Sequence, residues 1–186
     1  DDTRRRVLLI LNMNKVVQHI YEQIRATNTE AIVPVLDPGR PIRSTADMPI
    51  WYTTKPCGEI AKSQINFCVY DSTWEATEAF ALDRNPAVQA WAKNDHLGFE
   101  IFYLFLGIVR RYRPDFLIRL ENGECLVLET KGQDSPQNWA KRAALAEWVR
   151  AVNGHGGFGT WHCDVSFNTA DVDGIIAKYA GKQPAR

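Results

Sequence analysis

The chain has 186 residues, a hydrophobic content of 45% and a net charge of zero, which together are typical of a folded domain with a substantial core. No apolar run approaches the roughly 18 residues that a membrane-spanning helix needs, and no signal-peptide cleavage site follows the first apolar stretch. We therefore expect a cytoplasmic protein. The balanced charge also argues against a nonspecific nucleic-acid binder that works without other domains.

The four cysteines indicate neither a metal site nor a disulfide framework. They stand far apart and form no closely spaced pair of the kind that binds zinc. A chain of this length can also build a core without disulfides. The pattern favours reduced thiols at Cys57, Cys68, Cys125 and Cys163.

The first 50 residues differ in composition from the rest. Apolar residues recur at helical spacing from Thr3, a candidate N-cap, to Arg25. Five prolines then punctuate residues 27–58, which predicts an extended connector lying on a surface. We therefore divide the chain into a helix with a Pro-rich connector at residues 1–50 and a folded domain at residues 51–186.

The folded domain alternates between strand and helix patterns. A strand at 63–70 is followed by a helix that Asp71 or Ser72 caps, and Asn85-Pro86 predicts a second short helix over 86–94. Then come strand patterns in FEIFYLFLGIVRRY, PDFLIRL and ECLVLETKG, a helix at 136–152, a helix end and turn in GHGGFG, a strand in WHCDVSF and a last helix in DVDGIIAKYA. This order predicts the α/β class, as an α+β fold with a mixed sheet flanked by helices.

Charged residues occupy half-buried positions in the hairpin YRPDFLIRLENGECLVLETKG. A two-residue loop at Asn122-Gly123 would mix charged and large apolar side chains on both faces. A three-residue loop, Glu121-Asn122-Gly123 with a left-handed glycine, segregates them. In that register Asp115 lies opposite Glu129, and Lys131 projects to the same side as Glu129. The other face then carries Phe116, Ile118, Leu126 and Leu128.

The charged face of this hairpin has the composition of a metal site. Two opposed carboxylates repel each other unless a cation lies between them. Mg²⁺ is held by one or two carboxylates, waters and phosphate oxygens, so Asp115 and Glu129 are candidate ligands. Lys131 would orient an attacking water or stabilise the transition state. The alternative is a surface salt-bridge cluster, because a lone Glu-x-Lys on a strand is common.

Pro114-Asp115, followed by Glu129-Thr130-Lys131, resembles the motif of the PD-(D/E)xK nuclease superfamily. The runs AKNDHLGFEI, RYRPDFLIRL and LVLETKG are similar to the C-terminal endonuclease region of type III restriction enzyme Res subunits, which carry a helicase motor. The resemblance covers roughly residues 45–167. It implies a restriction-endonuclease-like core, in which a helix, a three-stranded meander, a second helix and a further strand follow one another.

The resemblance also implies roles for individual residues. Asp115 and Glu129 would bind Mg²⁺ or Mn²⁺ with the backbone carbonyl of Thr130, and Lys131 would be the catalytic lysine. Many members of the superfamily add an acidic residue from the first core helix, for which Glu75 is our choice and Glu78 the alternate. Favourable charge near a helix N-terminus would explain both acidic residues equally well.

Basic residues near the hairpin are candidates for contact with DNA phosphates. Arg113 precedes the strand that begins at Asp115, and Lys141 and Arg142 lie near the start of the helix at 136–152. A solvated rim is the alternative interpretation of all three.

The resemblance therefore implies a Mg²⁺-dependent endonuclease that cuts duplex DNA in a bacterial or archaeal cytoplasm. The chain would be a C-terminal piece of a longer protein. A preceding helicase motor would bind ATP, since this sequence has no P-loop motif, and a modification subunit would recognise the target. Two alternatives stay open: a non-catalytic DNA- or subunit-docking module of the same fold, and another metal-dependent phosphodiesterase or RNA-directed nuclease.

Overall fold

The computed structural model describes residues 1–27, 52–63, 65–130 and 134–181, and a four-stranded mixed sheet forms its centre. The strands are β3 (Val88–Lys93), β6 (Phe116–Leu120), β7 (Cys125–Thr130) and β8 (Trp161–Ser166). They lie in the order β3-β6-β7-β8, with β6 antiparallel to both of its neighbours and β8 parallel to β7. The predicted class, a mixed sheet flanked by helices, is confirmed.

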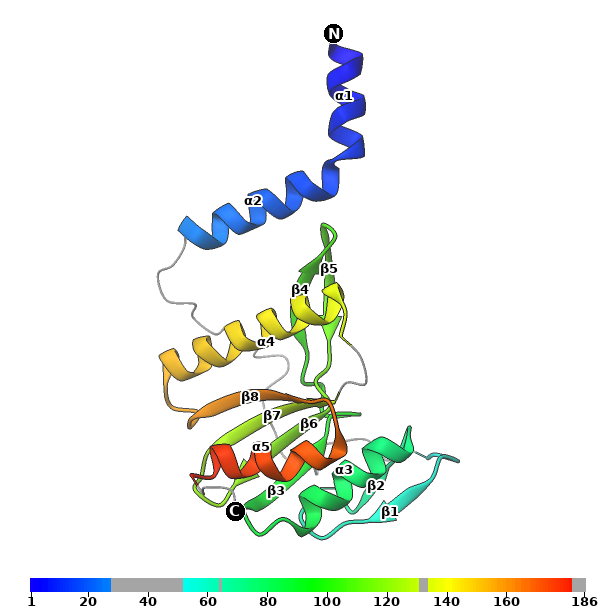
Figure 1. Cartoon of the computed structure of the whole chain (residues 1–186), viewed down its shortest axis with the longest axis vertical. Coiled ribbons are helices and arrows are strands. Elements are labelled where there is room, and N and C mark those ends of the chain that lie inside the picture. The colour runs from blue at the N-terminus through cyan, green and yellow to red at the C-terminus, as the bar shows by residue number, and fades with distance from the viewer. Residues whose placement is uncertain (28–51, 64, 131–133, 182–186) are drawn as a thin grey trace.

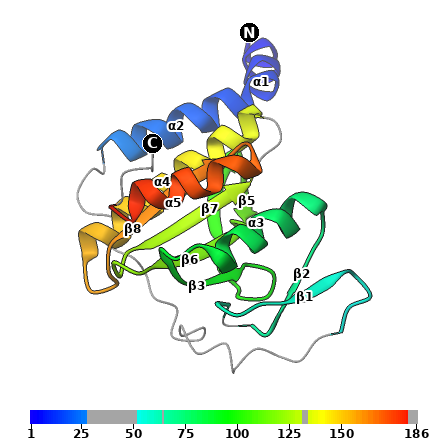
Figure 2. The same cartoon turned by 60° about the horizontal axis from the view of Figure 1, so that its bottom comes forward.

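Helices cover both faces of this sheet, as Figures 1 and 2 show. α3 (Thr73–Arg84) and α5 (Val172–Tyr179) pack on one face, and α4 (Pro136–His155) packs on the other. A short 3-10 turn, η2 (Thr169–Asp171), leads from β8 into α5. The sheet therefore separates two apolar cores.

The β6–β7 hairpin has the predicted register. Phe116 pairs with Leu128, and the Leu120 N–H donates to the carbonyl of Glu124 at 2.8 Å across the loop. Gly123 is left-handed in that loop, with a φ of 85°. The faces segregate as expected. The core with α3 and α5 contains Phe116, Ile118, Leu126 and Leu128, whereas the core with α4 contains Leu117 and Val127.

The short helix predicted over residues 86–94 is wrong, because these residues form β3. Pro86 suits the first turn of a helix, but Val88 and Trp91 are buried, and the Trp91 ring meets Phe116 edge-on at 5.9 Å between centroids. Pairing with β6 and burial of these apolar side chains outweigh the local signal for a helix.

The single helix predicted over residues 3–25 is two helices, α1 (Asp2–Leu11) and α2 (Met13–Thr27). They part at Asn12, whose side-chain amide donates to the carbonyl of Leu8 at 2.9 Å and competes with the helical backbone. Figure 1 shows α1 extending away from the sheet, and none of its residues is buried. The domain boundary predicted at residue 50 and most of the Pro-rich connector lie outside the described residues.

A small sheet precedes α3. Its strands, β1 (Cys57–Glu59) and β2 (Phe67–Val69), are antiparallel, so the strand predicted over 63–70 is shorter than expected. Between them, Ser63 forms an isolated parallel bridge with Trp91, and the Trp91 N–H donates to the carbonyl of Lys62 at 3.0 Å. This segment therefore lies along the outer edge of β3.

A two-stranded ribbon is inserted between β3 and β6. Its strands, β4 (Ile101–Phe105) and β5 (Ile108–Tyr112), occupy the region where FEIFYLFLGIVRRY predicts strands. The turn at Leu106-Gly107 is left-handed at both residues, with φ of 52° and 74°, which suits a two-residue hairpin loop. Figure 1 shows the turn reaching toward α2. The face of the ribbon that packs against α4 buries Ile101, Tyr103 and Tyr112.

The remaining elements follow the sequence predictions. Ser72 caps α3, and its hydroxyl accepts from the Glu75 N–H at 3.2 Å. α4 ends at His155, with Gly156 at a φ of 75° as its C-cap, so GHGGFG is the predicted helix end and turn. All four cysteines are free thiols. Within the described ranges, no helix combines the length and the apolar character needed to cross a membrane.

Candidate functional site

Two acidic residues lie at the end of the β6–β7 hairpin that is farthest from its loop. Asp115 immediately precedes β6, and Glu129 is the second-last residue of β7. The register that pairs Phe116 with Leu128 continues outward to Asp115 and Glu129, so the two residues lie opposite each other. Glu129 is only 2% exposed, and Asp115 is half-buried.

Asp115 is held from the strands on both sides. Its Oδ2 accepts from the Thr130 N–H at 2.8 Å and from the Thr130 hydroxyl at 2.9 Å. Its backbone carbonyl accepts from the N–H of Asn94, one residue beyond β3, at 2.8 Å. The Asn94 side-chain amide also donates to the carbonyl of Pro114 at 3.0 Å. The Pro-Asp dipeptide is therefore fixed relative to β3 and β7.

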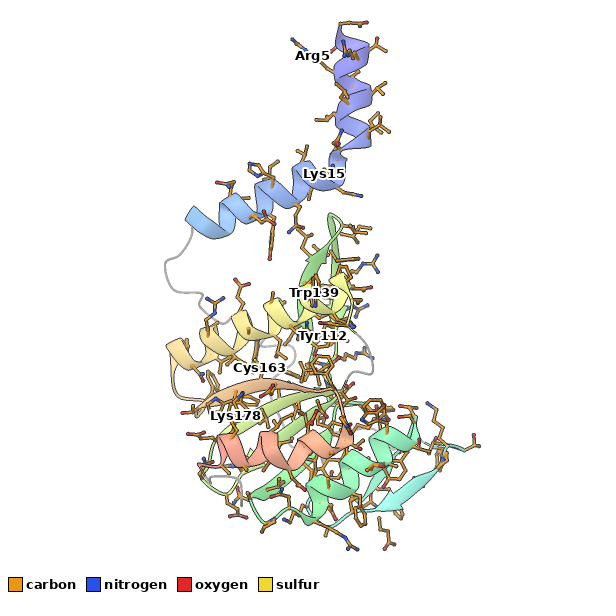
Figure 3. All side chains as sticks on the ribbon, in the orientation of Figure 1. Arg5, Lys15, Tyr112, Trp139, Cys163 and Lys178 are labelled. Carbon is orange, nitrogen blue, oxygen red and sulfur yellow. The ribbon has the colours of Figure 1, made fainter. Side chains whose placement is uncertain are left out.

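Glu129 is bound by a tyrosine from the ribbon. The Tyr112 hydroxyl donates to Glu129 Oε2 at 2.5 Å, and both side chains are buried. Burial, reinforced by the charge of Glu129, raises the pKa of Tyr112, so the phenol keeps its proton and remains the donor. Figure 3 shows Tyr112 between the N-terminal end of α4 and the sheet. From α4, the ammonium of Lys141 lies 5.3 Å from the centre of the Tyr112 ring.

Glu78, on α3, brings a third buried carboxyl group close to these strand ends. It is 0% exposed, and its Oε1 accepts from the Trp74 indole N–H at 3.1 Å. Its Oε2 accepts no hydrogen bond among the described residues, because the nearby Ser166 hydroxyl donates to the carbonyl of Asn168 at 2.8 Å instead. Burial raises the pKa of Glu78 to about 7. Polar contacts with Ser166 and Trp74 oppose this rise, and the charge of Asp115 adds to it. Glu78 interacts with Ser166, and Ser166 pairs with Thr130 in the sheet. Glu78 therefore lies near the end of β7.

Glu75, our first choice on this helix, has other partners. Its carboxylate forms an ion pair with Lys93 at 2.8 Å, and its Oε2 accepts from the Asp71 N–H at 3.0 Å. Glu78 is the more deeply buried of the two and carries the oxygen without a partner. Of the two candidates, Glu75 is therefore engaged by Lys93, and Glu78 is the one with an oxygen that accepts no hydrogen bond among the described residues.

Lys93 is a buried charge that the sequence analysis missed. Its side chain is 8% exposed, and its ammonium lies 2.7 Å from Asp71, 2.8 Å from Glu75 and 3.3 Å from Asp95. Although burial alone would lower it, hydrogen bonds with Asp71 and Glu75 raise the pKa of Lys93. The helix predicted over residues 86–94 does not indicate that Lys93 is buried. A strand over VQAWAK would place Lys93 at its end, one residue before Asn94, whose N–H donates to the Asp115 carbonyl.

The predicted DNA-contacting residues differ in how they are engaged. Arg113 binds Glu100 through Nε at 2.8 Å and Nη2 at 2.5 Å. Arg142 binds both oxygens of Asp134, at 2.8 and 2.6 Å. Lys141, by contrast, lies over the ring of Tyr112, whose hydroxyl donates to Glu129. Of the three, Lys141 therefore contacts the residue that binds Glu129.

The acidic residues fit the chemistry of a hard divalent cation. Mg²⁺ and Mn²⁺ prefer oxygen ligands, and Mg²⁺ commonly takes one or two carboxylates and completes its shell with water. Asp115 and Glu129 supply two carboxylates. Glu78 belongs to α3, which packs on the sheet face opposite the core that holds Tyr112, the partner of Glu129. Over the parts of the chain that the structure describes, no three His, Cys, Asp or Glu side chains are grouped closely enough to hold a metal. The catalytic candidate Lys131 lies outside the described residues.

Comparisons of the chain with protein-family models, with curated proteins and with solved structures find no match. A functional proposal therefore depends on the contacts of these side chains and on the sequence motif.

Proposed function

We propose that the chain is a restriction-endonuclease-like nuclease domain of the type III Res kind, which hydrolyses phosphodiester bonds of duplex DNA with Mg²⁺ or Mn²⁺. The observation that carries this proposal is the opposition of Asp115 to the buried Glu129 at one end of a hairpin. Burying a carboxylate is costly unless a partner compensates its charge. The order α3, β3, β6, β7, α4, β8 supports the proposal, although the expected strands in FEIFYLFLGIVRRY form the separate β4–β5 ribbon between β3 and β6 instead of a strand of the meander.

Each side chain of the site has a separate task in this proposal. Asp115 and Glu129 hold the cation, beside the backbone carbonyl of Thr130, and Glu78 or Glu75 supports it. The bound cation supplies Lewis acidity and lowers the pKa of a bound water. Thr130 orients Asp115 through two hydrogen bonds. Lys131, two positions after Glu129, orients the attacking water or stabilises charge on the phosphate.

DNA contact in this proposal begins at Lys141. Its ammonium lies over the ring of Tyr112, the partner of Glu129, and has the charge to bind a phosphate next to the scissile bond. Arg113 and Arg142 would exchange Glu100 and Asp134 for DNA phosphates. Target recognition by a modification subunit, and ATP use by a preceding helicase motor, belong to the same proposal through the resemblance.

A non-catalytic module that docks DNA or a partner subunit is the second candidate. It is favoured by the hydrogen bonds that Asp115 and Glu129 already accept from Thr130 and Tyr112. Donors of this kind also stabilise carboxylates that have only a structural role. Such a module would bind its partner without requiring a divalent cation.

Cleavage of supercoiled plasmid DNA in Mg²⁺ or Mn²⁺ tests the first candidate. Asp115→Asn keeps the shape of the side chain but removes the charge, and we expect it to lower the cleavage rate at least about 100-fold. Glu121→Gln is the matched control, since it removes one carboxylate from the exposed loop of the same hairpin. We expect it to cleave like the wild type, and chelation of the cation to stop cleavage by both.

Equal cleavage by the wild type and Asp115→Asn would rule out this site as the nuclease centre. Calorimetric titration with Mn²⁺, without DNA, separates the two candidates if the wild type does not cut. A metal-binding site should lose its heat of binding in Asp115→Asn. A docking module should show DNA binding that neither Asp115→Asn nor chelation changes.

A further inference from the structure

Residues 112–115 form hydrogen bonds with two neighbouring residues at the end of β7, Glu129 and Thr130. At one end of this segment, the Tyr112 hydroxyl donates to Glu129 Oε2 at 2.5 Å. At the other end, Asp115 Oδ2 accepts from the N–H and the hydroxyl of Thr130 at 2.8 and 2.9 Å. The same short segment therefore supplies one acidic residue of the candidate site and orients the other.

We propose that Tyr112 is a positioning residue, whose hydroxyl fixes the Glu129 carboxylate in the orientation that binds the divalent cation. The inference rests on the proposed function and assigns to that site a residue from outside the acidic motif. A carboxylate on a strand end can rotate about its side-chain torsions. A hydrogen bond to one of its oxygens selects one rotamer and sets the direction of the other oxygen.

The surroundings of Tyr112 make it suitable for this task. The residue is 3% exposed and pairs with Ile101 in the ribbon. Its ring belongs to the core with α4, together with Val127 and Leu145. A ring enclosed on all sides cannot follow a carboxylate that moves. The hydroxyl is therefore a fixed donor for one oxygen of the Glu129 carboxylate.

The short segment between Tyr112 and Asp115 restricts how far the backbone of Asp115 can move relative to Tyr112. Only Arg113 and Pro114 lie between them, and the proline ring restricts its own φ to about −65°. Asn94 additionally binds the carbonyls of Pro114 and Asp115, at 3.0 and 2.8 Å. Short covalent and hydrogen-bonded connections thus link Asp115 to the residue that orients Glu129.

Tyr112→Phe removes the hydroxyl and keeps the ring in its core. Tyr103→Phe is the matched control, because Tyr103 lies in the same core and its hydroxyl accepts from the Gln137 side-chain amide at 2.6 Å, away from Glu129. Titration calorimetry with Mn²⁺ alone measures the effect on the whole 186-residue chain. We expect Tyr112→Phe to raise the Kd for Mn²⁺ about 10- to 100-fold, and Tyr103→Phe to leave it unchanged within about twofold.

The outcomes separate this inference from the proposed function. If Glu129→Gln abolishes Mn²⁺ binding while Tyr112→Phe binds like the wild type, the metal site stands and the positioning role is overturned. An equal loss in both Tyr→Phe variants would also overturn it, because the effect would then come from the shared core. If the wild type binds no Mn²⁺, the proposed function fails. A crystal structure of Tyr112→Phe then decides the positioning role, which an unchanged Glu129 rotamer would refute.

Discussion

The unpartnered oxygen of Glu78 should make the stability of the protein depend on pH in a specific way. The pKa of about 7 in the folded protein lies above the ordinary 4.5, a difference that corresponds to roughly 3 kcal/mol. Below pH 4.5 the carboxyl group is protonated in both states and its burial carries no ionic penalty. As the pH rises toward 7, the unfolded chain releases this proton first, so stability falls. Above pH 7 the penalty is complete.

Glu78→Gln should abolish this dependence, because the amide is neutral at every pH. We expect the wild type to lose about 3 kcal/mol relative to Glu78→Gln between pH 4 and pH 8, measured as the free energy of unfolding in urea. The comparison cancels the titration of the other carboxylates, which both proteins share. Glu121→Gln, in the exposed loop, should follow the wild-type curve.

Repeating the unfolding measurement with added Mn²⁺ tests whether a cation binds near Glu78. A cation close to Glu78 stabilises its ionised form, so the wild type should regain part of the lost stability at pH 8 when Mn²⁺ is added. Glu78→Gln should gain less. Parallel curves for the wild type and Glu78→Gln from pH 4 to pH 8 would refute the reasoning, because they would show that the buried carboxylate is already compensated within the folded chain.

Two further predictions concern the elements around the site. Lys93→Met should lower the free energy of unfolding by about 2–3 kcal/mol, because three partly exposed carboxylates lose their shared cation. The control is the exposed Lys55→Met, which should lose less than about 1 kcal/mol in the same urea denaturation. Equal losses in the two variants would contradict this prediction. Deletion of Asn122 should shorten the hairpin loop and shift the register by one residue, which turns Asp115 and Glu129 to opposite faces. A deletion variant that keeps the wild-type circular dichroism spectrum and Mn²⁺ affinity would disprove the register argument.

The hairpin could be predicted from the sequence because its determinants are local. Gly123 supplies the left-handed residue of the loop, and the alternation of apolar and charged residues permits only one register. Once that register is set, the opposition of Asp115 to Glu129 follows from counting along two strands. No contact from outside the hairpin is needed for this step.

The third carboxyl group and the buried lysine depend instead on tertiary contacts. Glu75 and Glu78 are equivalent in a helical pattern, and only the packing of α3 on the sheet buries Glu78 and gives Glu75 to Lys93. Asn85-Pro86 is a local helix-start signal and predicts a helix where β3 lies, whereas the pairing of β3 with β6 depends on residues beyond an inserted ribbon. The role of Tyr112 was hidden for the same reason, since its hydroxyl meets a different strand.

The segment that bridges to Trp91 has a consequence for how this sheet can associate. An edge strand with unpaired backbone groups is a template for strand addition by another chain. At Trp91 and Val88 of β3 that template is already occupied. The Trp91 N–H donates to Lys62, the Lys62 ammonium donates to the carbonyls of Asn85 and Val88 at 2.6 and 2.9 Å, and Asp83 accepts from the Lys62 N–H at 2.8 Å. A strand from a second molecule would have to displace this bridge, so the segment protects the β3 edge against edge-to-edge aggregation.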